Sequence, residues 1–89
     1  MENEIHVSGL VVHVRPSDVK LVHDAIGRLH GAEVHAATAD GRFVVTLESA
    51  SEADTLARVA EIARMPGVLS AGLAYHRVLG SANPSREDP

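Results

Sequence analysis

The sequence predicts an α+β sandwich in which a strand–helix–strand unit occurs twice, giving the order βαββαβ. Two stretches rich in β-branched residues, near residues 5–14 and 42–48, each precede an amphipathic helical pattern. Each helical pattern ends at a glycine, Gly31 or Gly67, and a further strand-like run follows. This order is that of a ferredoxin-like fold, with a four-stranded antiparallel sheet and two helices on one face.

The first strand is predicted over residues 5–14 and ends before Pro16, which has no backbone N–H to donate to a sheet. Ser17 or Asp18 is expected to cap the helix that follows. Gly31 is expected to stop this helix. Its apolar face consists of Val19, Val22, Ala25, Ile26 and Leu29.

The second and third strands are predicted to form a hairpin. The second covers about residues 32–38, and the third contains the run that begins at Phe43. Asp40-Gly41 between them is typical of a two-residue turn with positive φ angles. The two strands are therefore expected to be antiparallel neighbours.

The second helix is expected to begin with a capping box from Ser51 to Asp54, in which Asp replaces the usual Glu. Pro66-Gly67 ends it. Its apolar stripe is predicted to contain Leu56, Val59, Ala60 and Ala63, with Ile62 at the edge.

The last strand is predicted over about residues 68–78. Residues 1–79 are expected to form a single domain, because a chain of this length buries too little surface to divide its core. Residues 80–89 are polar and contain two prolines, so they are expected to form a disordered C-terminal tail.

Two right-handed crossovers predict the spatial strand order 4-1-3-2. Side chains alternate across a strand, so one set of residues in the first and third strands faces the helices. This set is Leu10, Val12, Val14, Phe43, Val45 and Leu47. In the last strand the larger residues are expected to join the core, namely Leu69, Ala71, Leu73 and Tyr75.

The opposite face of the sheet is then uncovered, and it is predicted to be a shallow trough. Small residues form its floor, valines lie beside them, and histidines and a carboxylate form its rim. Small residues in a sheet allow another backbone to come close. The trough is therefore a candidate peptide-binding surface, consisting of Gly9, Val11, His13, Val44, Glu48, Ser70, Gly72, Ala74 and His76.

Composition limits the classes of partner. The chain has 89 residues, a formal net charge of -4 and only eight scattered Lys and Arg residues, which disfavours nucleic acid. It contains no cysteine, so a thiolate metal site or a cysteine nucleophile is excluded. The N-terminus lacks the features of an export signal, and no stretch approaches about 20 apolar residues. We therefore expect a cytoplasmic protein that does not insert into a membrane.

The chain resembles the NapD family from about Val7 to Arg77. Four segments carry the resemblance: Ser8-Gly9-Leu10-Val11-Val12-His13-Val14, Gly31-Ala32-Glu33-Val34, Gly41-Arg42-Phe43-Val44-Val45-Thr46-Leu47-Glu48 and Pro66-Gly67-Val68-Leu69-Ser70-Ala71-Gly72-Leu73-Ala74-Tyr75-His76.

The resemblance implies a ferredoxin-like chaperone rather than an enzyme. Such a chaperone binds the twin-arginine signal peptide of the catalytic subunit of periplasmic nitrate reductase. It holds the precursor back from export until the molybdenum cofactor has been inserted. An acidic protein with an open, small-residue sheet face is compatible with this cationic and partly apolar ligand, and acidic groups are expected to meet the paired arginines.

Four alternatives compete with this interpretation. The six histidines suggest a metal site, but only His13 and His76 are expected to lie close together, and neither a metal nor another cofactor is expected. An acylphosphatase-like site would use Arg15, but its loop lacks a glycine-rich cradle. RNA binding needs aromatic residues on the sheet face, whereas Phe43 and Tyr75 are both expected in the core. A small-ligand regulatory or dimerisation module of ACT-like type stays open, as does the choice between a monomer and a weak homodimer.

Overall fold

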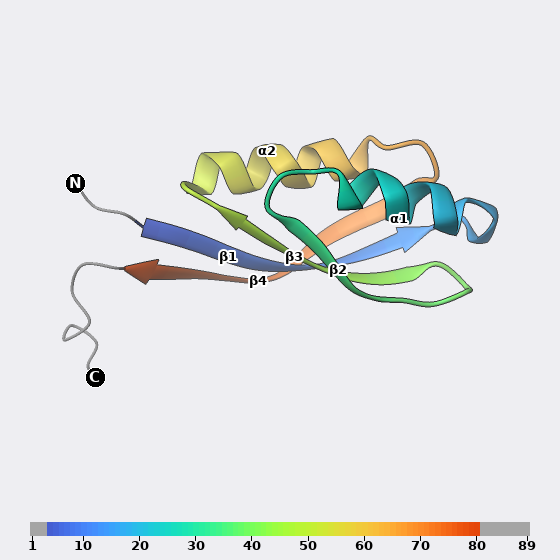
Figure 1. Ribbon diagram of the computed structural model, residues 1–89, viewed down its shortest axis with the longest axis horizontal. Coiled ribbons are helices and arrows are strands. Elements are labelled where there is room, and N and C mark those ends of the chain that lie inside the picture. The colour runs from blue at the N-terminus through green and yellow to red at the C-terminus, as the bar shows by residue number, and fades with distance from the viewer. Residues whose placement is uncertain (1–3, 81–89) are drawn as a thin grey trace.

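The computed structural model describes residues 4–80, so most of the predicted tail lies outside the described residues. The order of elements is βαββαβ, as predicted, and Gly80 still belongs to the last strand (Figure 1). The elements are β1 (Glu4–Val14), a 3₁₀ turn (Pro16–Asp18), α1 (Val19–Gly27), β2 (Ala32–Ala37), β3 (Arg42–Ser49), α2 (Glu52–Ala63) and β4 (Val68–Gly80).

The four strands form one antiparallel sheet in the order β2-β3-β1-β4, and both helices lie on the same side of it (Figure 1). This is the predicted strand order read from the opposite edge. The predicted fold class, a ferredoxin-like sandwich with one uncovered sheet face, is confirmed.

The core lies between the sheet and the helices and is built almost entirely from aliphatic side chains. All six residues that were expected to face the helices from the first and third strands are at most 2% exposed. Val22 and Ile26 of α1 and Ile62 of α2 complete this core. Burying a side chain of this size contributes about 1.5–3 kcal/mol to the free energy of unfolding relative to leaving it exposed. The contacts between the sheet and the two helices therefore stabilise the fold.

The ends of α1 differ from the prediction. Neither Ser17 nor Asp18 caps the helix through its side chain, because the chain enters it through a 3₁₀ turn in which Asp18 N–H donates to the Arg15 carbonyl. The helix ends at Gly27, before Gly31. Gly31 has φ 84° and its carbonyl accepts from Glu48 N–H, so it connects the loop after α1 to the end of β3.

The hairpin between β2 and β3 is confirmed, but its turn is not the predicted two-residue type. Gly41 has φ 99°, whereas Asp40 has no positive φ. Gly41 N–H donates to the Thr38 carbonyl, and Thr38 N–H donates to the Arg42 carbonyl. The loop is therefore three residues long, with glycine alone in the left-handed conformation.

Helix α2 has the predicted cap but a different buried face. The Ser51 side chain accepts a hydrogen bond from Asp54 N–H at 3.1 Å. Thr55 and Ile62 are buried, whereas Leu56 is 55% exposed. The buried face of α2 is therefore shifted by about one residue around the helix from the predicted apolar stripe. The polar Thr55 is tolerated because its hydroxyl bonds the Ser49 hydroxyl and the Ser51 carbonyl.

Strand β4 departs from simple alternation at two register shifts against β1. Gly9 lies opposite Tyr75 but Leu10 lies opposite Leu73, so Ala74 is an extra residue. A second shift leaves Leu69 without a partner between Val68 and Ser70.

The predicted core set of β4 is therefore only partly correct. Ala71 packs against the core as expected, and Leu73 shares the face of Leu10 although it is 45% exposed. Leu69 is 61% exposed, and Tyr75 shares the face of Gly9 rather than that of the core.

Candidate functional site

The open face of the sheet is the side away from α1 and α2, and its side chains form rows that run across β3, β1 and β4. Residues directly opposite one another in neighbouring strands share a face, so the register defines these rows. From one end to the other they are Arg42–His13–Ser70, Val44–Val11–Gly72, Thr46–Gly9–Tyr75, Glu48–Val7–Arg77 and Ile5–Leu79.

The row Val44–Val11–Gly72 is an open, apolar part of this face. Val44 is 43% exposed, although its neighbours Phe43 and Val45 are fully buried on the other side. A Cβ added to Gly72 would have no atom within 4 Å, so space is free above this position. The row therefore presents an apolar strip beside open space at Gly72.

The next row is closed by an aromatic side chain. A Cβ added to Gly9 would lie only 2.7 Å from Cδ2 and Cζ of Tyr75, so the tyrosine ring covers this glycine. Gly9 is buried for that reason, while Tyr75 itself stays 47% exposed. The floor of the trough is thus shorter than predicted, and Tyr75 forms a wall across it.

Seven of the nine predicted site residues lie on the open face, and two do not conform. His76 lies opposite Ser8, on the helix side of the sheet, because the extra residue Ala74 reverses the alternation that follows it. Ala74 itself is the bulged residue and lacks a partner in β1. The site residues on the open face are Gly9, Val11, His13, Val44, Glu48, Ser70 and Gly72.

Tyr75 is the main residue of this face that the sequence prediction missed, because the alternation rule assigned it to the core. The isolated glycine in β1 is the signal that could have found it, since a glycine within a strand leaves room for a large cross-strand neighbour. Phe43 lies in the core as expected, so one aromatic residue faces the open side instead of none.

His76 forms its contact on the helix side, with His6. The His6 Nδ1 and His76 Nε2 atoms are 3.0 Å apart, and the ring planes differ by 20°. One nitrogen must donate and the other must accept, so at least one of these two nitrogens carries no proton. His6 is 7% exposed, and its Nε2 lies 3.5 Å from the Glu4 carboxylate. The expected proximity of His13 and His76 is therefore wrong.

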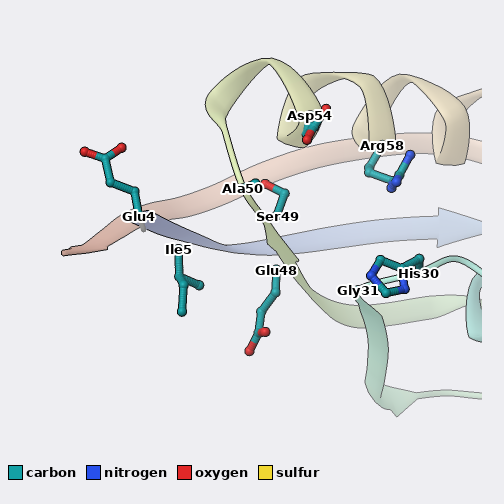
Figure 2. Close-up of a pocket in the computed structure, with 9 residues that line it drawn as sticks. All are labelled: Glu4, Ile5, His30, Gly31, Glu48, Ser49, Ala50, Asp54 and Arg58. Carbon is teal, nitrogen blue, oxygen red and sulfur yellow. The ribbon is translucent and has the colours of Figure 1, made fainter. Parts of the chain in front are cut away.

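Carboxylates gather at the end of the sheet where β1 begins and β3 ends. A cavity of about 440 Å³ lies there, and Figure 2 shows Ile5 and Glu48 pointing away from α2, which carries Asp54 and Arg58. The acidic groups outnumber the single arginine, so this cavity favours a cation. Its lining consists of Glu4, Ile5, His30, Gly31, Glu48, Ser49, Ala50, Asp54 and Arg58.

The opposite end of the open face is different in charge. His13 lies beside Arg42 and Ser70, and its Nδ1 is 3.3 Å from the Ser70 hydroxyl. In the adjoining turn, a hydrogen bond from the Thr38 hydroxyl lowers the pKa of Asp40 below its usual 3.8, and the charge of Arg42 acts in the same direction. The open face thus carries Arg42 at this end and both Glu48 and Arg77 in one row at the other end, where the adjoining cavity adds the carboxylates of Glu4 and Asp54.

Among residues 4–80, no group of three or more His, Cys, Asp or Glu side chains is placed to hold a metal ion. Within the same residues, neither helix is both long and apolar enough to cross a membrane.

Comparison with known proteins identifies one family. The family model described as NapD protein matches residues 5–79. The solution structure of the E. coli Tat proofreading chaperone protein NapD has a similar fold, with a TM-score of 0.79 at 22% sequence identity. The alignment covers 100% of this chain and 92% of that chain. No curated protein sequence matches the chain.

Proposed function

Because the chain belongs to the NapD family, we propose that it is a cytoplasmic chaperone that binds the twin-arginine signal peptide of the catalytic subunit of periplasmic nitrate reductase. Binding would hold the precursor back from export until the molybdenum cofactor has been inserted. The protein's part is recognition, and no catalytic residue is proposed.

The uncovered face of the sheet is the observation that carries this proposal. An apolar strip at Val11 and Val44, with free space over Gly72 and the ring of Tyr75 beside it, suits the apolar part of a signal peptide. Burial of apolar area would supply most of the affinity, since each exposed charge pair contributes only about 0–1 kcal/mol.

The distribution of charge supports one orientation of the peptide. Glu48 adjoins the cavity that Glu4 and Asp54 also line. Arg77 lies in the same row of the open face as Glu48, so the attraction for paired arginines at this end would come from the three carboxylates together. Arg42 would repel them at the other end. We therefore place the arginine pair near Glu48 and the apolar stretch over Val11.

The proposal is tested by titrating a synthetic twin-arginine signal peptide into isotopically labelled protein and following backbone amide signals. The largest shifts are expected on the open face of β1, β3 and β4. Val11→Asp and Gly72→Glu should weaken binding at least tenfold, because each puts a carboxylate in the apolar strip. Leu56→Asp is the matched control, since Leu56 is equally apolar and 55% exposed but belongs to α2.

Three results would contradict the proposal. One is unchanged affinity in both open-face variants while each keeps its native circular dichroism spectrum. Another is calorimetric binding of free amino acids without any binding of the peptide, which would favour the ACT-like regulatory alternative. Shifts confined to α1 and α2 would place the peptide on the wrong side of the molecule.

A further inference from the structure

The two edges of the sheet differ in how open they are to another strand. β4 runs from Val68 to Gly80, and among the described strands it pairs only with β1. The other edge strand, β2, has six residues and carries Glu33 and His35, whose side chains lie 3.9 Å apart. Short edges with charged side chains resist pairing with a second chain, whereas long edges with few charges invite it. β4 is therefore the edge available for pairing.

Exposed apolar side chains are concentrated along this edge. Nine large apolar side chains are exposed in the part of the chain that the structure describes, and five of them belong to β4. These apolar side chains do not stabilise a monomer, because they stay in contact with water. The five residues are Leu69, Leu73, Tyr75, Val78 and Leu79.

The charges of β4 distinguish between two kinds of partner strand. From Val68 to Gly80 the strand contains no carboxylate and one arginine, Arg77. A cationic signal peptide laid along this edge would meet a like charge and no opposite charge. A second copy of the chain would bring its own Tyr75, whose ring face attracts a guanidinium group. The edge is thus complementary to itself rather than to the peptide.

We propose that two copies of the chain pair through their β4 edges, antiparallel about a two-fold axis, with His76 of one copy opposite His76 of the other. This register places Tyr75 opposite Arg77 of the second copy, and it does so twice by symmetry. Directly opposite Cβ atoms lie about 4.5–5.5 Å apart, which is within reach of a cation–π contact. The result is a continuous eight-stranded sheet whose open faces adjoin.

Neighbouring symmetric registers are less favourable. A register centred on Arg77 would set two guanidinium groups opposite each other, and like charges in that position destabilise a sheet. A register centred on Tyr75 would place the bulged Ala74 opposite His76, directly beside the axis. The register centred on His76 separates the two arginines and moves Ala74 away from the axis, opposite Val78. Its central pairs, Tyr75–Arg77 and His76–His76, lie in the segment that follows the bulge.

The test is sedimentation velocity of the full chain from low micromolar to millimolar concentration, with and without substitutions at the two paired positions. The wild type should dimerise reversibly. Tyr75→Lys should weaken the dimer about tenfold or more, because it sets two like-charged pairs across the axis. Adding Arg77→Glu to Tyr75→Lys should restore it, since each lysine then faces a glutamate. Glu33→Lys at the β2 edge is the matched control and should leave dimerisation unchanged.

Circular dichroism confirms that each variant is folded, so loss of the dimer is not confused with loss of structure. A wild type that stays monomeric throughout overturns the proposal, and so does a double variant that fails to recover.

Binding of the twin-arginine peptide is measured separately on the same wild-type samples. A monomer that binds the peptide refutes edge pairing alone, whereas a dimer that does not bind it refutes the proposed function alone. A peptide that competes with the dimer by adding to β4 also overturns the proposal.

Discussion

The ring of Tyr75 covers the backbone of Gly9 on the open face, although the two residues are far apart in the chain. The contact joins the edge strand to a central strand and closes one end of the exposed apolar strip. It exists because Gly9 has no side chain and because the bulge at Ala74 turns the ring to this side. Tyr75 therefore influences both the stability and the shape of the candidate peptide-binding face.

Gly9→Ala is expected to displace the tyrosine ring without unfolding the sheet. The atoms that a new Cβ would meet belong to a side chain that is 47% exposed and free to swing outward. The free energy of unfolding should change by no more than about 1 kcal/mol. Tyrosine fluorescence should change, and it reports this residue alone because the chain has one Tyr and no Trp. Gly72→Ala is the matched control, and emission that is equal in the two variants would contradict the contact.

His76→Ala is expected to destabilise the fold by about 1–3 kcal/mol, because it leaves a buried nitrogen of His6 without its hydrogen-bond partner. Urea unfolding measures this difference. His35→Ala is the control, since it removes an exposed hydrogen bond to Thr46 and should change stability by less than about 0.5 kcal/mol. Equal effects of the two substitutions would argue against a structural role for the His6–His76 pair.

Thr55→Ala is expected to destabilise the protein more than Leu56→Ala, although leucine is the more apolar residue. Thr55 is 1% exposed and its hydroxyl bonds two partners, so its loss should cost about 1–2 kcal/mol. Leu56 is 55% exposed, so its truncation should cost less than about 0.5 kcal/mol. Thermal unfolding of the two variants distinguishes them, and the reverse order would restore the helix face predicted from the apolar pattern.

Asp40 is expected to contribute to acid sensitivity. The pKa of Asp40 is lowered in the folded protein, chiefly by the Thr38 hydroxyl. The ionised carboxylate therefore favours folding at pH values above its usual pKa of 3.8. This contribution should be lost as the pH falls through the folded-state value below 3.8. A carboxyl carbon NMR titration should show the pKa of Asp40 rising in Thr38→Val. An unchanged titration curve in that variant would mean that the hydroxyl is not the cause of the shift.

Glu48→Gln is expected to weaken binding of the twin-arginine peptide by a few-fold and to reduce its dependence on salt. An exposed charge pair contributes about 0–1 kcal/mol and is screened by added ions. Calorimetry at low and moderate salt measures both effects. Glu52→Gln is the control, because Glu52 is an exposed residue in the first turn of α2. An identical salt dependence in the wild type and Glu48→Gln would place the arginines elsewhere.

The central strands were predictable because their alternation is regular. Leu10, Val12 and Val14 were assigned to the core by spacing alone, and all three are at most 2% exposed. Their outward neighbours Val11 and His13 were assigned correctly for the same reason. In α2 the same reasoning assigned Leu56 rather than Thr55 to the buried face. A pattern of apolar residues cannot predict that a polar side chain is buried when its hydroxyl forms hydrogen bonds within the protein, as that of Thr55 does.

The sequence by itself determined the order of the elements, the strands that pair and the residues of the central core, because these follow from local periodicity and from turns that require glycine. Only the tertiary structure decided which way the second half of β4 faces. That choice depends on the extra residue Ala74, which arises where β4 is matched against Gly9 and Leu10 of β1. A single unpaired residue reverses every later side chain, so Tyr75 lies on the open face and His76 meets His6 beneath it.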